Sequence, residues 1–204
     1  MTRIPFDVVV FDFDGTLVLS ADIKRRAFFE IFPDQCAPAV SAVLEQDPEG
    51  SRNKVIPAMI AEAATRGIDS NSLHADELVA AYAKRVAAGV GAAPEAPGGE
   101  EALKSVGEHA SVYIASTTPH EELLRHLERR DWTRWVREAY GFPYQKPDVV
   151  KQLLRRHNCV PQRLLVVGDG ETDEQAARVN RCAFLKAESG WPERLMKYFS
   201  ANDR

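Results

Sequence analysis

Short runs of apolar, β-branched or aromatic residues recur along this chain. The clearest are residues 8–11, 111–116, 163–169 and 182–185, and a shorter one lies near 138–140. Uninterrupted runs of this length are typical of strands that are covered on both faces, as in a parallel sheet. The pattern therefore predicts a set of buried strands distributed over the whole chain.

Helical segments follow these runs. The four residues from Thr118 have the pattern of a capping box with proline at the first helical position, which predicts a helix to about residue 130. Pro147 opens a helix that ends near residue 158, and a second capping box from Thr172 opens one that ends at Asn180. Strands that alternate with helices predict an α/β fold with a doubly wound, Rossmann-like parallel sheet.

The stretch between residues 20 and 90 departs from this alternation because it contains helical patterns without a strand. The predicted helices are 20–32, 37–46, 53–66 and 75–88. The passage 89–99 is rich in glycine and proline and is the best linker in the chain. We therefore expect a catalytic core formed by residues 1–18 and 92–204, interrupted by an inserted α-helical cap domain at 19–91.

Composition excludes several classes of protein. Apolar residues make up 45% of the chain and charged residues 27%, which is ordinary for a globular protein. The formal net charge is −4, so duplex nucleic acid is not an expected partner, and an anionic ligand must be met by a local positive site. No apolar run approaches the ~20 residues of a membrane span. The early acidic residue and the three scattered cysteines favour a cytoplasmic protein with free thiols.

Polar side chains gather where the predicted strands end. They are Asp12, Asp14, Ser116, Lys146, Asp169 and Asp173. In an open parallel sheet the carboxyl ends of the strands form the ligand-binding edge. Because Asp12 and Asp14 are two residues apart in an extended segment, their side chains point to the same side. Two adjacent carboxylates require either a cation between them or a raised pKa.

The donor types at this edge indicate the ligand. Carboxylate oxygens without sulfur or imidazole favour Mg²⁺, which commonly combines one or two carboxylates with a substrate phosphate. The segment 168–173 also resembles a dinucleotide-binding loop, but Asp173 replaces its third glycine and the segment lies late in the chain. The spacing therefore favours a metal-assisted phosphate site.

These motifs together resemble the haloacid dehalogenase superfamily of phosphotransferases. The segment VVVFDFDGTLV at 8–18 is similar to the first signature of the family, 114–116 to the second, Lys146-Pro147 to the third and 168–173 to the fourth. The signatures occur in the family's order over nearly the whole chain. The helical insert is similar to the cap of the phosphoglycolate phosphatase and β-phosphoglucomutase branch, and an aspartate at position 14 implies phosphoryl transfer rather than carbon–halogen cleavage.

The resemblance implies a role for each polar residue of the edge. Asp12 would be the nucleophile, and Asp14 the general acid and base. Mg²⁺ would be held by Asp12, the main-chain carbonyl of Asp14 and Asp169, with Asp173 as a further ligand or support. Ser116 would donate its hydroxyl to a phosphoryl oxygen, and Lys146 would balance charge on Asp12 and on the phosphate.

Substrate binding is expected from two regions. The resemblance implies that Gly15, Thr16 and Thr117 lie against the substrate in the core. In the cap, Arg52 and Asn53 stand at a predicted helix start, where Arg52 could bind a second anionic group such as a carboxylate. We expect a monomer or homodimer that acts on a small phosphorylated metabolite.

The expected activity is that of a Mg²⁺-dependent phosphatase with an aspartyl-phosphate intermediate. Two alternatives remain open at this stage: a phosphomutase of the β-phosphoglucomutase type, and a non-catalytic phosphate-binding regulatory module. Arg181 stands where the family often has glycine, so Asn180 is expected to take the left-handed conformation at the end of its helix. His120 and His126 are expected to face solvent.

Overall fold

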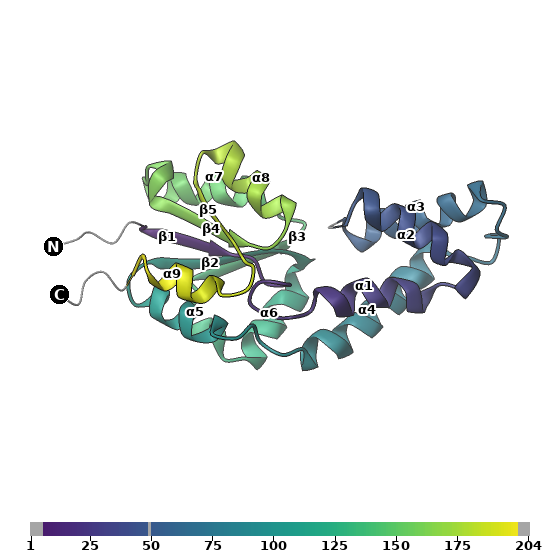
Figure 1. The fold of residues 1–204 in the computed structure, drawn as a ribbon, viewed down its shortest axis with the longest axis horizontal. Coiled ribbons are helices and arrows are strands. Elements are labelled where there is room, and N and C mark those ends of the chain that lie inside the picture. The colour runs from purple at the N-terminus through teal and green to yellow at the C-terminus, as the bar shows by residue number, and fades with distance from the viewer. Residues whose placement is uncertain (1–5, 49, 200–204) are drawn as a thin grey trace. The chain divides into compact units, whose positions relative to one another are not determined.

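The computed structural model describes residues 6–48 and 50–199. Within these residues the chain forms two compact units (Figure 1). One contains residues 6–19 and 94–199, and the other contains residues 20–93. The chain passes between the units twice, after Leu19 and before Pro94. These two residues of the first unit are hydrogen-bonded to each other, because the N–H of Leu19 donates to the carbonyl of Pro94 at 2.9 Å.

The first unit is built on a sheet that, within the described residues, has five strands, all parallel. In sequence order they are β1 (Val8–Phe11), β2 (Ser111–Pro119), β3 (Glu138–Phe142), β4 (Leu164–Gly168) and β5 (Ala183–Lys186). The spatial order is β3-β2-β1-β4-β5, which places β1 at the centre. The predicted α/β class, with a Rossmann-like parallel sheet and inserted helices, is confirmed.

Helices cover both faces of this sheet (Figure 1). On one face lie α7 (Lys146–Arg156) and α8 (Glu171–Asn180), and on the other lie α5 (Gly99–Gly107), α6 (His120–Arg129) and α9 (Trp191–Met196). Alternate residues of β1 serve the two faces: Val8 and Val10 join the core under α7 and α8, whereas Phe11 packs against Trp191 with ring centroids 5.9 Å apart. Burial on both faces explains why the strands are continuous apolar runs.

The second unit is entirely helical in its described part. Its helices are α1 (Ala21–Ile31), α2 (Ala37–Gln46), α3 (Arg52–Thr65) and α4 (Ala75–Ala92). This unit also contains the single-turn 3₁₀ helix η1 (Asp34–Cys36), and the first unit contains η2 (Trp132–Arg134) and η3 (Pro161–Arg163). In α3 the residues Val55, Met59 and Ala63 are buried, as their spacing predicts. Phe28 and Tyr82 join α1 to α4 through rings stacked 4.2 Å apart.

The expected linker at 89–99 is partly wrong. Helix α4 continues through Gly89 and Gly91 to Ala92, because Val86 and Val90 are buried on one face and carry the helix onward. Sequence patterns did not single out α5, in which Leu103 and Val106 are buried, or the short α9. Among the described residues, no helix is both long enough and apolar enough to span a bilayer.

Both capping boxes are displaced from their expected positions. Thr118 and Pro119 belong to β2, and α6 begins at His120, because the Thr118 hydroxyl is used elsewhere. Helix α8 begins at Glu171 with Gly170 as its N-cap residue. The N–H of Gly170 donates to the side chain of Asp173 at 3.4 Å.

The expected left-handed conformation of Asn180 is wrong, since Arg181 takes it with φ +59°. The side-chain amide of Asn180 donates to the carbonyls of Pro147 and Ala176, both at 2.9 Å. These bonds keep Asn180 in the helical conformation, so the left-handed conformation occurs at the next residue, Arg181.

Candidate active site

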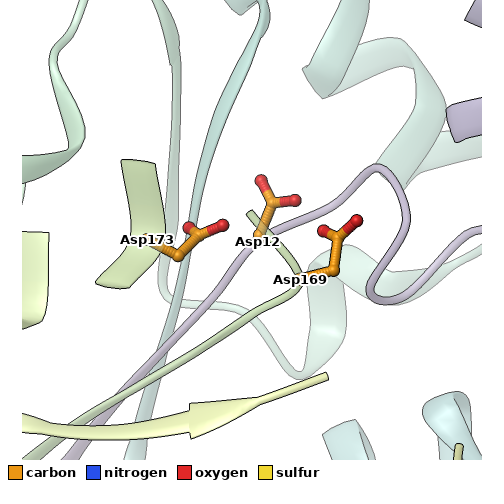
Figure 2. Close-up of side chains that lie close together, drawn as sticks. All are labelled: Asp12, Asp169 and Asp173. Carbon is orange, nitrogen blue, oxygen red and sulfur yellow. The ribbon is translucent and has the colours of Figure 1, made fainter. Parts of the chain in front are cut away.

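Three carboxylates meet at the carboxyl edge of the sheet (Figure 2). Asp12 follows β1, Asp169 follows β4 and Asp173 lies in the first turn of α8. One oxygen from each lies within 4.8 Å of the others. The adjacency of β1 and β4 in the sheet explains the convergence, because it brings two distant segments of the sequence to one point.

Two glycines allow these carboxylates to approach the backbone. Gly15 has φ +82°, and a Cβ built on it would lie 2.1 Å from Oδ2 of Asp169. A Cβ on Gly168 would lie 2.2 Å from Cγ of Asp173. A larger residue at either position would displace a carboxylate. Gly15, expected to bind substrate, is therefore in contact with a carboxylate of the cluster.

Lys146 joins two of the three carboxylates. Its Nζ donates to Oδ1 of Asp12 and to Oδ1 of Asp173, each at 2.8 Å. The residues of this triad are almost fully buried, with exposed fractions of 8% for Lys146, 5% for Asp12 and 2% for Asp173. The expected convergence of Lys146 and the 169–173 segment on Asp12 is thus present in the fold. The side chain of Asp169 remains accessible beside the triad.

Charge in this cluster is unbalanced. Burial raises the pKa of Asp12 well above its usual value, and the charges of Asp173, Asp169 and Asp14 raise it too, while Lys146 lowers it. Burial also lowers the pKa of Lys146, but attraction to Asp12 and Asp173 outweighs it and leaves that pKa above its usual range. One ammonium therefore faces several carboxylates, and a further cation would stabilise the ionised state.

The donor set fits a hard divalent cation. Asp12, Asp169 and Asp173 offer only carboxylate oxygens, which Mg²⁺ prefers to nitrogen or sulfur. Two ligands of one Mg²⁺ lie at most about 4.2 Å apart, twice the usual metal–oxygen distance. Oxygens already within 4.8 Å of one another need only a small movement to share an ion.

Asp14 is turned toward two hydroxyl groups of β2. Its Oδ2 accepts hydrogen bonds from Ser116 Oγ at 3.2 Å and from Thr118 Oγ1 at 2.6 Å. Ser116 and Thr118 are both buried, and the Thr118 N–H donates to Ser116 Oγ at 3.0 Å. The side chain of Asp14 thus lies outside the cluster of Asp12, Asp169 and Asp173. The expected role of its main-chain carbonyl as a metal ligand stays a prediction.

Thr118 is a site residue that the sequence analysis missed. The capping-box pattern predicts that its hydroxyl caps a helix, a role that would keep it away from the site. The available signal was the period of a strand, in which residues 116 and 118 face the same side. Ser116 was expected to contact a phosphoryl oxygen, whereas here its hydroxyl donates to Asp14.

The remaining expected substrate residues have different surroundings. Thr16 is fully buried, and its hydroxyl donates to Oδ1 of Asp169 at 3.1 Å, so it orients a carboxylate of the cluster. Thr117 is exposed beyond the end of the apolar part of β2. Arg52 and Asn53 lie in the first turn of α3 in the helical unit, where the Arg52 guanidinium lies over the Tyr82 ring at 6.0 Å. Their binding roles stay predictions.

A buried aromatic cluster fixes the loop between Asp12 and Asp14. Phe13 is fully buried; its ring stacks on His126 with centroids 5.7 Å apart and meets Trp132 edge-on at 6.3 Å. The Arg130 guanidinium lies 5.9 Å from the Phe13 centroid. The expectation that His126 faces solvent is wrong, because the apolar side of α6 covers Phe13. Burial lowers the pKa of His126, and the charge of Arg130 lowers it further.

Comparison with known proteins assigns the family. A model of the haloacid dehalogenase-like hydrolases matches residues 6–180, and the chain belongs to this family of hydrolases. No match is found among curated proteins.

Solved structures share the fold at low sequence identity. A predicted phosphoglycolate phosphatase from Haemophilus somnus aligns with a TM-score of 0.71 and 16% identity, over 89% of this chain and 85% of that one. A proposed β-phosphoglucomutase from Thermotoga maritima aligns with a TM-score of 0.66 and 18% identity, over 97% and 100%. A haloacid dehalogenase-like hydrolase from Streptococcus pneumoniae aligns with a TM-score of 0.65 and 20% identity, over 96% and 99%. The expected resemblance to these branches is confirmed.

Proposed function

We propose that this hydrolase is a Mg²⁺-dependent phosphatase that acts on a small phosphorylated metabolite through an aspartyl-phosphate on Asp12. The observation that carries the proposal is the buried Asp12 carboxylate, bonded to Lys146 and adjacent to Asp169 and Asp173. A nucleophilic carboxylate, a fixed positive charge and a divalent-cation site within one cluster are what phosphoryl transfer requires. Membership of a hydrolase family adds support.

In the first step an oxygen of Asp12 attacks phosphorus, and the bond between phosphorus and the ester oxygen breaks. Asp14 donates a proton to the departing oxygen, so the product leaves as an alcohol. The hydroxyls of Ser116 and Thr118 hold the Asp14 side chain in one orientation. Lys146 keeps one oxygen of Asp12 fixed through its 2.8 Å hydrogen bond and offsets the charge of the phosphate.

In the second step water attacks phosphorus of the aspartyl-phosphate. Asp14, now ionised, takes a proton from that water as the bond between phosphorus and Asp12 breaks. Inorganic phosphate leaves, and both aspartates return to their starting state. When bound, Mg²⁺ would be held by Asp12, Asp169 and Asp173 and would neutralise charge on the carboxylates and the phosphoryl oxygens.

The proposal predicts Mg²⁺-dependent release of phosphate. The wild-type protein should release phosphate over many turnovers from at least one member of a panel of phosphorylated acids, sugars and nucleotides, without a bisphosphate activator. Asp169→Asn should need about ten times more Mg²⁺ for half-maximal rate or more, because one anionic ligand is lost. The measurement is phosphate release against Mg²⁺ concentration, with Glu171→Gln in the exposed first residue of α8 as the matched control.

Three results would count against this proposal. Phosphate transfer to a second sugar hydroxyl that depends on a bisphosphate would indicate a mutase. Absence of turnover over the whole panel would indicate a binding module. An identical Mg²⁺ titration in Asp169→Asn would remove Asp169 from the metal site.

Thr118 offers a test of how Asp14 is held. Hydrogen bonds to charged groups contribute about 1.5–3 kcal/mol, which corresponds to roughly ten- to a hundredfold in rate. Thr118→Val should therefore lower kcat by about tenfold or more and leave KM nearly unchanged. Thr118→Ser keeps the hydroxyl and should stay within a few-fold of wild type. Equal rates in the valine and serine variants would show that the 2.6 Å bond has no part in the reaction.

A further inference from the structure

Tyr144 is an exposed aromatic residue in the turn between β3 and α7. The exposed fraction of this residue is 50%. Its ring nevertheless has two aromatic neighbours: His120 at 5.5 Å with an interplanar angle of 64°, and Tyr140 at 5.5 Å with an angle of 80°. Its backbone N–H donates to the carbonyl of Gly141 at 3.1 Å. The ring is therefore held by edge contacts while much of its surface stays in water.

Tyr144 lies close in the sequence to residues of the candidate active site. Tyr144 lies two residues before Lys146, whose Nζ contacts Asp12. His120 lies two residues after Thr118, whose hydroxyl contacts Asp14. The start of α6 is joined to β3 where the N–H of Gly141 donates to His120 Nδ1 at 3.4 Å. The aromatic contact thus connects the two segments that reach the catalytic carboxylates, at the carboxyl edge of the sheet.

A ring fixed in this way is suited to bind another flat group. An aromatic side chain that is already ordered loses little conformational entropy when a ligand packs on it. Aromatic pairs contribute about 0.5–1.5 kcal/mol beyond simple burial, whether stacked or edge-on. The phosphate is handled by the carboxylate cluster and Lys146, so a group at Tyr144 would belong to the rest of the substrate.

We propose that Tyr144 is a specificity-determining residue whose ring packs against an aromatic or heteroaromatic leaving group of the phosphate ester. This inference rests on the proposed function, since it assigns the non-phosphate part of the substrate of the same site. The substrate class is then a phosphate monoester with a planar ring within reach of the phosphorus. The hydroxyl of Tyr144 is not required for this role.

The test compares the binding of phenylphosphonate and methylphosphonate, which differ in the ring alone and are not hydrolysed. Affinities are measured by calorimetry with Mg²⁺ present for wild type, Tyr144→Ala and Tyr144→Phe. Tyr198→Ala is the matched control, because Tyr198 has an exposed fraction of 44% and packs on Phe6 at the opposite end of β1. Tyr144→Ala should weaken phenylphosphonate by about three- to tenfold and leave methylphosphonate within twofold. Tyr144→Phe and Tyr198→Ala should match wild type.

Several outcomes would overturn the inference. The first is that wild type binds phenylphosphonate and methylphosphonate with equal affinity, or binds neither. The second is that Tyr144→Ala weakens the binding of the two compounds equally. The third is that Tyr144→Phe loses the preference for phenylphosphonate. Turnover is scored separately with phenyl phosphate. A protein that binds phenylphosphonate through Tyr144 but releases no phosphate would contradict the proposed phosphatase and leave the role of Tyr144 intact.

Discussion

Replacing Asp12 with asparagine is expected to lower phosphate release by on the order of a thousandfold or more, because an amide cannot form the acyl-phosphate bond. The fold should survive this change. Asparagine has nearly the same shape, and Lys146 keeps its 2.8 Å hydrogen bond to Asp173. The midpoint of thermal unfolding should therefore stay within a few degrees of wild type. Phosphate release and circular dichroism on the same preparation check both parts.

The control for this variant is Asp148→Asn, an exposed aspartate in the first turn of α7 that should retain full activity. Asp12→Ala guards against slow deamidation of the asparagine back to aspartate. If Asp12→Asn and Asp12→Ala both kept more than about one-hundredth of wild-type activity, Asp12 would not be the nucleophile.

The second large effect is on stability. Lys146→Met leaves Asp12 and Asp173 buried without their shared ammonium group. Removing one partner of a buried ion pair typically costs about 3–5 kcal/mol, so the free energy of unfolding should fall by about this amount in the presence of a chelator. Mg²⁺ should restore part of the loss, because a divalent cation supplies positive charge to the same carboxylates. Urea unfolding with and without Mg²⁺ measures both quantities.

Lys151→Met provides the matched control, since Lys151 lies on the same helix and is exposed. The pKa of Lys146 is raised in the folded state, so its stabilisation is fully present below the usual lysine pKa and is lost only at strongly alkaline pH. Removal of the Lys146 charge also raises the pKa of Asp12 further, so the difference in stability between wild type and Lys146→Met should not fall as the pH rises from about 6 to 9. A Lys146→Met protein as stable as Lys151→Met in chelator would contradict the charge balance inferred for this cluster.

Most of the fold could be predicted because its strands are buried on both faces. Val8 to Phe11 must be apolar at every position, and this requirement is visible in the sequence. The spatial order of the strands is not visible, since it depends on which apolar faces pack together. Helices α5 and α9 begin at or beside glycine and are short, with 9 and 6 residues, so each contains fewer than three turns of a helical pattern.

The candidate site was partly predictable for a geometric reason. The carboxyl ends of parallel strands share one edge, so the sequence pattern predicts that Asp12 and Asp169 lie close together. The errors arose where a polar side chain had two possible partners. The Thr118 hydroxyl could cap a helix or bind Asp14, and the 2.6 Å hydrogen bond to the half-buried Asp14 carboxylate prevails. His126 could face solvent or cover Phe13, and packing against the fully buried ring prevails.

The most direct test of the central claim is to locate the transferred phosphoryl group on the chain. The protein is mixed with acetyl phosphate and Mg²⁺, quenched in acid and analysed by peptide mass spectrometry. The Asp14→Asn variant is run in parallel, because loss of the general base should slow hydrolysis and let the intermediate accumulate. The account predicts a phosphoryl group on Asp12, and more of it in Asp14→Asn. The account would be contradicted if phosphate were released and no phosphoryl group were found on Asp12 in either protein, or if the phosphoryl group were found on Ser116 instead.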